Sequence, residues 1–432
     1  MDTRAVYGDA AAVPVRSRTG ARSYHSEPVD PRTRTPVVGM VGAGQLARMT
    51  HQAAVALGQS LRVLAAAPDE PAALVSPDVT LGAHTDLAVL RAFAAGCDAV
   101  TFDHEHVPTE HLRALVADGF AVHPGPDALV HAQDKLVMRH RLAELEIPMP
   151  PFSAVTAVAD VLRFGAEHGW PCVLKATRGG YDGRGVWMLT TSSEAQRVVP
   201  ELLAETRSSG IDTVGAPLLV EQCVAMRREL VALVARSPFG QGAAWPIVQS
   251  VQHDGICVQV LAPAPELDPE LAQSAEKLAL RLAGELGVVG VLAVELFETH
   301  HGLLVNELAM RPHNGGHWTI EGAVTSQFEQ HLRAVLDYPL GATAAHAPVT
   351  VMANVLGAGA APPMGLDERL HHLMARFPGA KVHLYGKAER PRRKIGHVTV
   401  LGEELAPVRR DAGLAAQWLA TAVWADGREV HG

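Results

Sequence analysis

The stretch GVLAVELFETHHGLLVNELAMRPHNGGHWT, residues 290–319, determines how the centre of the chain folds. Two apolar runs of strand length, Val291–Phe297 and Leu303–Leu308, flank four turn-like residues, 299–302. Such a pattern is typical of an antiparallel hairpin. The sequence therefore predicts two paired strands here, followed by a polar segment that begins at Arg311.

Three polar residues interrupt the apolar runs of this hairpin. Pairing about the turn sets Glu295 opposite Asn306 or Glu307. Side chains across such a pair lie about 4.5–5.5 Å apart at Cβ, a span that Mg²⁺ bridging phosphate oxygens would fill. Oxygen ligands without His or Cys favour Mg²⁺ over Zn²⁺. The alternative is two carboxylates on the solvent face of an ordinary hairpin.

Composition excludes several classes of protein. The chain has 432 residues, 48% of them apolar, so it can bury a large core divided among two or three domains. A net charge of −9 argues against a nucleic-acid partner, whose phosphates require a basic face. The apolar run Val288–Val294 is much shorter than the roughly 20 residues of a membrane span. We expect no membrane contact.

Cysteine usage favours a reduced, cytoplasmic setting. The four cysteines stand far apart and form no Cys-x-x-Cys pair, which suggests neither disulfides nor structural zinc: Cys97, Cys172, Cys223 and Cys257. Residues 1–35 are rich in Arg, Ser, Thr and Pro and show no periodicity. We expect a disordered tail there, with the ordered protein beginning near Pro36.

The chain then reads as three units. Residues 36–132 alternate strand and helix patterns, beginning with the strand Val37–Val41 and the phosphate-type loop Gly42-Ala43-Gly44-Gln45-Leu46-Ala47, and predict a Rossmann-like α/β domain. Residues 133–345 have strands of antiparallel character, with Asp134 as an expected N-cap. Residues 346–432 predict a small, mostly β unit. The fold class is thus α/β followed by α+β.

A glycine-rich segment follows a strand that ends in lysine. Lys175 precedes residues 179–185, where four glycines free the backbone to turn its amides toward phosphates. It is not a P-loop, because the Gly-Lys-Ser/Thr ending is absent. Further on, the strand 218–220 runs into residues 221–224, a hinge that can offer backbone groups to an adenine edge, and the Glu229 carboxylate can accept ribose hydroxyls.

This order of features resembles the ATP-grasp superfamily, and within it the 5-(carboxyamino)imidazole ribonucleotide synthases of purine biosynthesis. The likeness covers residues 36 to about 404. It is carried by GAGQLARM (42–49), TFDHEHVP (101–108), GGYDGRGV (179–186), EQCV (221–224), NELAMRPHNGGHWT (306–319) and YGKAERPRRKIGHV (385–398). The last two motifs are the specific ones. The resemblance implies an ATP-grasp central domain, a homodimer, and ATP, bicarbonate and 5-aminoimidazole ribonucleotide as substrates.

The resemblance also implies roles for individual residues. Expected to bind ATP are Lys135, Lys175, Gly180, Tyr181, Asp182, Gly183, Arg184, Gly185, Val186, Glu221, Gln222, Cys223, Val224, Glu229, His253, Asn306 and Glu307. Glu295 and Glu307 would bind Mg²⁺. Bicarbonate would be held by Arg311, His313 and Asn314, with Tyr181 and Asp182 from the glycine-rich loop. The aminoimidazole ribonucleotide would contact Gly44, Gln45, Leu46, Glu105, Lys387 and Arg393.

Four residues depart from the pattern of the family. Ala43 and Ala47 replace two glycines of the usual GGGQLGRM, and Ala43 could narrow the approach of a phosphate. Gly315 stands where serine is usual, and Arg392 where glycine is common. None of these changes removes a charged group, so we expect altered affinity at most. His313 could transfer a proton or only donate a structural hydrogen bond.

Other functions remain to be distinguished from this one. Another ATP-grasp enzyme, such as the formate-dependent glycinamide ribonucleotide transformylase, is the nearest alternative, and residues 311–317 speak against it. An NAD-binding oxidoreductase or regulator could use residues 42–47, but Ala65–Ala67 stand where a ribose-binding carboxylate is expected. A nucleotide-binding but inactive protein would lack Glu295 or Glu307. A zinc site at His104-Glu105-His106 would need a third ligand that the sequence does not show.

Overall fold

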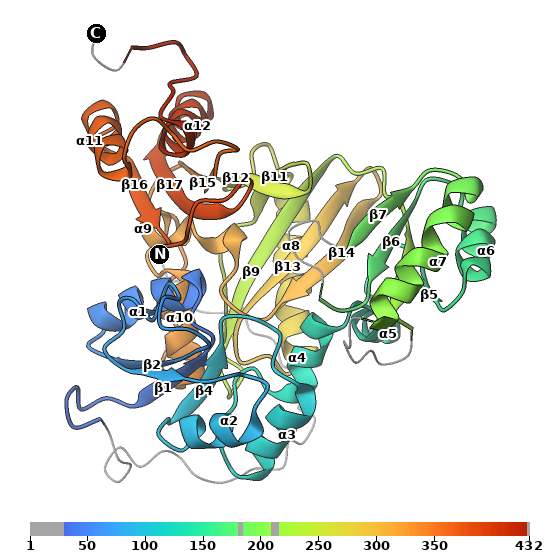
Figure 1. Ribbon diagram of the computed structural model, residues 1–432, viewed down its shortest axis with the longest axis horizontal. Helices are drawn as coiled ribbons and strands as arrows, with labels where there is room; N and C mark the ends of the chain where they lie inside the picture. Colours follow the sequence, from blue (N-terminus) through green and yellow to red (C-terminus); the bar gives the residue numbers. More distant parts are fainter. Residues whose placement is uncertain (1–29, 180–184, 209–215, 430–432) are drawn as a thin grey trace, which may run out of the picture.

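The computed structural model describes residues 30–179, 185–208 and 216–429. Within these ranges the strands form one parallel four-stranded sheet, one nine-stranded sheet and a second, antiparallel four-stranded sheet. Figure 1 shows the parallel sheet (blue) beside the long central strands, with the small antiparallel sheet (green) on the other side of them. The arrangement confirms the expected α/β first domain and the mixed central domain.

The first domain is built on parallel strands in the order β3-β2-β1-β4. Their bounds are β1 Val37–Val41, β2 Ser60–Ala65, β3 Val79–Leu81 and β4 Ala99–Phe102. The helices are α1 Gln45–Ala56, α2 Leu87–Ala94, α3 Thr109–Ala117 and α4 Pro126–Gln133. One parallel bridge, between Val100 and Val122, continues the sheet beyond β4. The loops after β1 and β4 meet at one edge of this sheet, where ligands bind in such folds.

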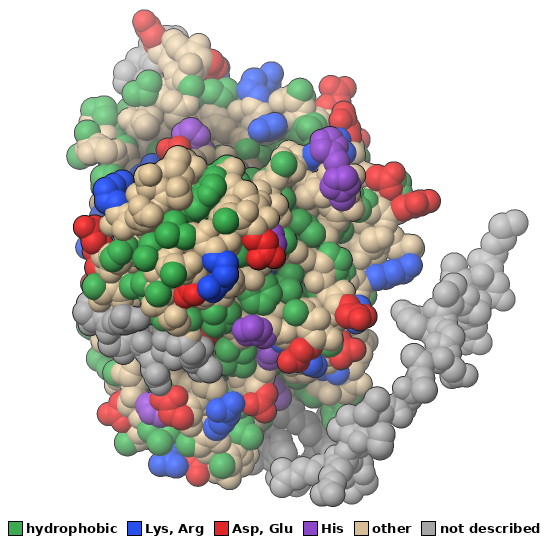
Figure 2. All heavy atoms as spheres, turned by 90° about the vertical axis from the view of Figure 1, so that its right-hand side faces the viewer, with side chains coloured by type: hydrophobic (Ala, Val, Ile, Leu, Met, Phe, Trp, Pro, Cys, Tyr) green, Lys and Arg blue, Asp and Glu red, His purple; other side chains and the backbone are tan. Residues whose placement is uncertain are grey.

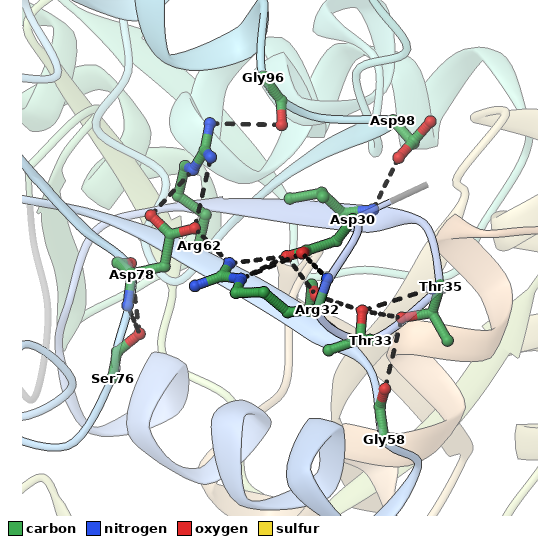
Figure 3. A network of polar contacts seen from close by, with 12 residues as sticks. Asp30, Arg32, Thr33, Thr35, Gly58, Arg62, Ser76, Asp78, Gly96 and Asp98 are labelled. Carbon is green, nitrogen blue, oxygen red and sulfur yellow. Dashed lines mark hydrogen bonds and ion pairs between the residues drawn. The ribbon is translucent and has the colours of Figure 1, made fainter. Parts of the chain in front are cut away.

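The expectation of disorder as far as residue 35 is wrong for residues 30–35. Asp30 is buried, and its carboxylate accepts bonds from the Arg32 side chain and, at 2.8 Å, from the Ser60 hydroxyl. Arg32 also bonds Asp78, which pairs with Arg62 (Figure 3). These contacts fix residues 30–35 to the first domain, because Asp30 bonds Ser60 and Arg32 pairs with Asp78. Residues 1–29 lie outside the described residues.

The central sheet runs β14-β13-β9-β11-β12-β15-β17-β16, with β10 paired to β9. Its strands from the central domain are β9 Arg228–Arg236, β10 Gly242–Ala244, β11 Val248–His253, β12 Ile256–Ala262, β13 Gly290–Thr299 and β14 Gly302–Ala309. Helices α8 Pro269–Glu285, α9 Thr319–Gly322 and α10 Gln327–Val335, with the 3₁₀ turn Asn314–Gly316, belong to the same region. Helix α10 packs against β13 and β9 on one side and α1 on the other, and so joins the first domain to the sheet.

The small antiparallel sheet has the order β5-β8-β6-β7. Its strands are β5 Phe152–Val155, β6 Cys172–Ala176, β7 Val186–Leu189 and β8 Leu218–Gln222. Helices α6 Val158–His168 and α7 Ser192–Ser208 pack on it, and α5 Lys135–Glu144 leads into it. The predicted N-cap of α5 is confirmed, since the Asp134 carboxylate accepts the N–H groups of Leu136 and Val137.

The C-terminal region extends the central sheet rather than forming a sheet of its own. Strands β15 Val349–Leu356, β16 Lys381–Leu384 and β17 Lys394–Gly402 join it through the antiparallel pairing of β15 with β12. Two helices, α11 Leu366–Arg376 and α12 Leu405–Thr421, cover these strands, and the sequence analysis did not predict the second of them. The shared sheet holds the basic segment of residues 387–394 beside the rest of the molecule.

Among the described helices, none is both long enough and apolar enough to cross a membrane. Figure 2 shows the face on the side of α6 and α7, where Lys and Arg side chains lie among Asp and Glu side chains.

Candidate active site

The hairpin predicted from residues 290–319 is present, with the expected register. Strands β13 and β14 pair antiparallel, with Glu295 opposite Glu307 and a register shift immediately after it. The Asn306 amide lies next to this pair, its Nδ2 3.4 Å from Glu295 Oε2. Three oxygen-bearing side chains are thus gathered on two adjacent strands.

Two lysines approach the acidic hairpin from other elements. Lys135, the first residue of α5, pairs through Nζ with Glu307 Oε1. Lys175, on β6, has its Nζ 2.6 Å from Glu221 Oε2 and 3.1 Å from Asn306 Oδ1. Burial alone would lower the pKa of Lys135, but the charges of Glu307 and Glu221 raise it, so the ammonium is retained. A triphosphate entering here would meet two cations already in place.

Glu221 is engaged by its carboxylate, not only by its backbone. It is buried and pairs with Lys175 and with Arg139, whose guanidinium is also buried. Burial alone would raise the pKa of Glu221, but the two cations lower it. Since the carboxylate is occupied in this way, an adenine contact from residues 221–224 would come from the backbone.

Arg139 is a residue that the sequence analysis missed. Besides Glu221, it donates to the carbonyl oxygens of Val305 at 3.1 Å and Asn306 at 2.8 Å. It therefore fixes β14 to α5 beside the cation ligands. A signal was available, because Arg139 lies three residues after Leu136 and three before Leu142, on the buried stripe of α5.

The residues after Glu221 that are expected to bind ATP lie at different distances from the Glu295 and Glu307 carboxylates. Cys223 and Val224 follow β8 and are half-buried, and Gln222 donates its N–H to Pro151 O at 3.0 Å. Burial, and secondarily the charge of Glu295, raises the pKa of Glu229 to about 7. His253 ends β11 with its side chain 79% exposed and its Nε2 3.8 Å from Asp254. The structure does not bring His253 into the cluster around Glu295.

The segment after the hairpin reaches back to the first carboxylate. His313 Nδ1 accepts the N–H of Gly315 at 3.2 Å, so the ring proton lies on Nε2, which is 3.2 Å from Glu295 Oε1. Burial alone would raise the pKa of Glu295, but the hydrogen bond from His313 and nearby cations lower it. Within the described part of the chain, Asn314 Nδ2 is buried and has no hydrogen-bond partner. An unpartnered amide at this place suits a small oxyanion.

Arg311 connects this segment to the first domain. Its Nε lies 2.8 Å from Glu105 Oε1, in the segment after β4. Burial alone would lower the pKa of Arg311, but Glu105, with Asp103 and Glu307, raises it. The flanking rings of His104 and His106 stack on each other, centroids 5.2 Å apart, while Glu105 points to Arg311. Two residues expected to bind different substrates are therefore in direct contact.

The phosphate-type loop of the first domain, residues 42–47, packs against the side chain of Asp103. Gly44 N donates to Asp103 Oδ2 at 2.5 Å, and burial raises the pKa of this carboxyl group to about 6. Gly42 has φ +100, and a Cβ there would lie 1.9 Å from Asp103 Oδ1. A cavity of about 340 Å³ adjoins the loop, and its lining includes Gly42–Gln45, His84, Asp103 and His104.

The basic C-terminal segment reaches the same loop at one residue. Lys387 Nζ donates to Gln45 Oε1, as expected of neighbours at one ligand. Arg393 is half-buried and donates to Ala388 O at 3.3 Å. Leu46 is buried against Met49 and Tyr385, so its side chain serves the core and only its backbone remains for a ligand.

The departures from the family pattern have structural explanations. Ala43 and Ala47 are buried in the core of the first domain, and Ala43 also lines the cavity beside the loop. Arg392 has φ +64, the left-handed conformation that explains the usual glycine. A Cβ at Gly315 would lie 3.1 Å from Val231 and 3.2 Å from His313 Nδ1, a tight fit for serine.

The glycine-rich loop is described only at its base. Residues 180–184, which include Tyr181, Asp182 and Arg184, lie outside the described residues. Gly179 and Gly185 have φ of +79 and +72, conformations that favour glycine, and Ala176 N donates to Gly185 O at 2.8 Å. Val186 then begins β7. The loop therefore leaves and re-enters the small sheet next to Lys175.

The residues of the hairpin fit a magnesium ion. Glu295, Asn306 and Glu307 offer only oxygen donors of the kind Mg²⁺ prefers, and lysines neutralise them here. Among the described residues there is no group of three His, Cys, Asp or Glu side chains suited to a metal cage. Mg²⁺ takes one or two carboxylates from a protein and fills its other positions with phosphate and water.

Comparison with known families places this fold and site in the ATP-grasp class. Family models match as ATP-grasp domain over residues 140–328, as ribonucleotide synthetase preATP-grasp domain over residues 36–133, and as phosphoribosylaminoimidazole carboxylase C-terminal domain over residues 350–411. The three matches follow one another along the chain.

Curated relatives identify the family within that class. The chain is 62% identical to N5-carboxyaminoimidazole ribonucleotide synthase of Mycobacterium tuberculosis, over 92% of this chain and 90% of the relative. It is 51% identical to the same enzyme of Corynebacterium ammoniagenes, over 90% and 94%. The chain belongs to the N5-carboxyaminoimidazole ribonucleotide synthase family of ATP-grasp ligases.

Solved structures agree. The enzyme of Thermus thermophilus is 37% identical, with a TM-score of 0.77 over 90% of this chain and 99% of that one. The enzyme of Aspergillus clavatus in complex with ATP is 31% identical, with a TM-score of 0.80 over 89% and 98%. The Aspergillus enzyme with ADP and 5-aminoimidazole ribonucleotide matches with a TM-score of 0.78 and 31% identity, over 89% of this chain and 98% of that one.

Proposed function

We propose that this chain carboxylates 5-aminoimidazole ribonucleotide with bicarbonate and ATP, giving N5-carboxyaminoimidazole ribonucleotide, ADP and phosphate in purine biosynthesis. The names of the relatives and the ligands of the Aspergillus complexes support it. The observation that carries it is one line of contacts. Glu295, one of the two carboxylates proposed to bind the cation, contacts His313. Arg311, two residues before His313, contacts Glu105 of the first domain.

The first half of the site holds ATP. Lys135 and Lys175 exchange their present carboxylate and amide partners for phosphate oxygens, while Glu295 and Glu307, with Asn306, hold Mg²⁺. The metal, when bound, neutralises charge that gathers on the transferring phosphoryl group. Backbone groups of residues 221–224 bind adenine, and Glu229 binds the ribose. Residues 180–186 close over the phosphates, and His253 borders the nucleotide.

The second half of the site turns bicarbonate into an electrophile. A bicarbonate oxygen attacks the γ-phosphorus, the bond to ADP breaks, and carboxyphosphate forms. Arg311 holds the anion with parallel N–H groups, and Asn314 donates its unpartnered Nδ2. Tyr181 and Asp182 cover it from the glycine-rich loop, which keeps water away from the labile intermediate.

His313 acts mainly as a hydrogen-bond donor. Its Nδ1 lone pair is occupied by Gly315 N–H, and its Nε2 proton is directed at Glu295. Neither nitrogen is free to accept a proton in this arrangement. His313 thus orients the Glu295 carboxylate, and a role in proton transfer would require the bond from Gly315 to break.

The aminoimidazole ribonucleotide receives the carboxyl group. Its exocyclic nitrogen attacks the carboxyl carbon, or the CO₂ released from it, and phosphate departs. Lys387, Arg393 and the backbone of residues 44–46 hold the phosphate of the nucleotide. Glu105 lies near its ring or ribose, and its contact with Arg311 brings acceptor and bicarbonate together.

The test is ADP release by purified protein with MgATP and bicarbonate, with and without 5-aminoimidazole ribonucleotide. Strong dependence on that nucleotide is expected. ADP release driven instead by formate and glycinamide ribonucleotide would support the alternative ligase and contradict this proposal. Binding of NAD, with no ADP release under either condition, would support the oxidoreductase or regulator.

Two further properties belong to the proposal. Family resemblance supports a homodimer, which sedimentation equilibrium would measure as twice the mass of one chain. The described cysteines are all free, and this supports a reducing, cytoplasmic location.

A further inference from the structure

We propose that Gln327 is a positioning residue for the bicarbonate segment, residues 311–314. Its side-chain amide grips the backbone of His313 and so determines where Arg311, His313 and Asn314 stand. The identity of the ligand rests on the proposed function. The geometry does not, because it concerns only contacts within the chain.

The amide of Gln327 makes two hydrogen bonds to one residue. Oε1 accepts the N–H of His313 at 2.8 Å, and Nε2 donates to the carbonyl oxygen of His313 at 2.8 Å. His313 has extended backbone angles, φ −121 and ψ 152. The amide thus supplies to this segment what a neighbouring β-strand would supply, although no strand lies there.

The second Nε2 hydrogen of Gln327 is also used. It points to His317 Nδ1 at 3.0 Å, and burial holds the pKa of His317 well below its usual value, so this ring is neutral and accepts the bond. The backbone N–H of Gln327 donates to Thr319 Oγ1 at 2.9 Å, and that hydroxyl donates to Gly316 O at 2.6 Å. With these bonds the orientation of the amide is determined.

Space around the amide is as restricted as its hydrogen bonds. Gln327 is fully buried, and a Cβ at Gly316 would lie 2.3 Å from Gln327 Oε1. The segment can approach the amide only because residue 316 is glycine. Since a buried N–H and C=O left without partners are unfavourable, loss of the Gln327 amide would release the segment from its present position.

Gln327 connects the segment to a fixed support. It is the first residue of α10, which packs against β13, the strand that carries Glu295. Through this helix the distance from His313 Nε2 to Glu295 is set at 3.2 Å. Gln327 therefore couples the bicarbonate groups to the cation ligands without touching either substrate.

The same helix offers a matched control. Gln330 is also fully buried, and its amide makes the same pair of bonds to Gly341: Nε2 to O at 2.9 Å, and Oε1 from N at 2.7 Å. Gly341 lies in the linker after α10, away from the hairpin and the bicarbonate segment. Both variants thus remove a buried amide with the same pair of backbone bonds, and Gln327→Ala also removes the bond to His317. Only the Gln327 amide holds the bicarbonate segment.

The experiment compares steady-state kinetics and thermal unfolding of the two variants. Both should lower the Tm by similar amounts. Gln327→Ala alone should raise the KM for bicarbonate tenfold or more, with the KM for ATP within twofold, and should release more ADP per product formed. Gln327→Glu, which keeps the size and the Oε1 acceptor but loses the donor, should change the same two quantities if the alanine variant does not fold.

Two different results would refute the proposed function and the role of Gln327. A wild-type protein that shows no bicarbonate- and nucleotide-dependent ADP release refutes the proposed function. An active wild type with Gln327→Ala or Gln327→Glu matching Gln330→Ala in bicarbonate KM and in ADP released per product overturns the role of Gln327 alone.

Discussion

At the residue scale, the buried side chain of Asp103 restricts position 42 to glycine. It fills the space above the loop after β1, where Gly42 combines φ +100 with a Cβ position 1.9 Å from Asp103 Oδ1. Gly42→Ala should therefore lower the free energy of unfolding by roughly 2–4 kcal/mol, from backbone strain plus the clash. Denaturant unfolding would measure it.

Gly119 supplies the control for that prediction. It has φ +93, close to that of Gly42, but a Cβ there would meet no atom within 4 Å. Gly119→Ala should cost only the backbone term, about 1–2 kcal/mol. Equal costs at the two positions would show that Asp103 does not restrict the loop.

Arg392 has a left-handed backbone conformation, φ +64, which strains a residue that has a Cβ. Its guanidinium bonds Asp254 Oδ2 at 3.2 Å and Asp254 O at 3.0 Å, but both side chains are mostly exposed, 58% and 61%. An exposed pair contributes about 0–1 kcal/mol, similar to the strain that glycine would relieve. Arg392→Gly should leave the free energy of unfolding within about 1 kcal/mol of wild type. A loss above roughly 2 kcal/mol in urea unfolding would contradict this balance.

Glu307 tests the assignment of the cation ligands. It is partly exposed and pairs with Lys135, so Glu307→Gln should leave the Tm within a few degrees of wild type. Turnover should be abolished, because a neutral amide binds Mg²⁺ poorly beside a triphosphate. ADP release and a thermal scan on the same preparation measure both. An active variant would refute the metal assignment.

At the scale of elements, Arg139 holds α5 against β14. It is buried with Glu221, and truncating one partner of such a pair costs about 3–5 kcal/mol. Arg139→Ala should reduce the free energy of unfolding by that amount and raise the KM for ATP, since Glu221 then binds Lys175 more strongly. Arg141 on the same helix pairs with exposed Glu144, and Arg141→Ala should stay within about 0.5 kcal/mol. Similar losses for both variants would contradict the role of Arg139.

Elements whose cause is local could be predicted from the sequence. The hairpin register follows from two short strands and one turn, and the Asp134 cap from a polar residue before an apolar helix. Helix α12 was missed, and the joining of β15 to β12 could not be predicted, because strand neighbours far apart in sequence are chosen by packing.

The site divides in the same way. Glu295, Glu307 and Lys135 were found from motif and spacing, and the structure places them together. Arg139 and Gln327 bond backbone atoms of distant residues. The apolar stripe of α5 indicates that Arg139 is buried, but no residue pattern identifies the partners of either side chain. His253, which a motif position suggested for the nucleotide, lies exposed at the end of β11, and its role stays a prediction.

For the whole molecule, buried histidines predict sensitivity to acid. Burial lowers the pKa of His331 to about 3 and holds those of His317 and His397 well below the usual value. The unfolded chain binds these protons near pH 6.5, so the free energy of unfolding should fall as the pH drops below about 6.5. His104, whose pKa burial lowers to about 3, adds a fourth proton of this kind. Asp103 and Glu229 offset two of the four, because their raised pKa values let the folded chain bind their protons first.

Urea unfolding between pH 8 and pH 4 measures this slope. We expect a net loss near two protons, on the order of 2–3 kcal/mol per pH unit. His331→Gln should reduce the slope by about one proton, since His331 bonds Thr101 Oγ1 and Val291 N as a neutral ring. A free energy of unfolding that does not change between pH 7 and pH 5 would contradict the burial of these groups.

The central claim is that bicarbonate receives the γ-phosphoryl group at the junction of Glu295, His313 and Arg311. The most direct measurement is the transfer of ¹⁸O from labelled bicarbonate during a rapid, quenched turnover with MgATP and 5-aminoimidazole ribonucleotide. If carboxyphosphate forms and then gives up its carboxyl group, the phosphate released should carry one bicarbonate oxygen per molecule. Phosphate without the label, formed at the same rate as ADP, would contradict the account.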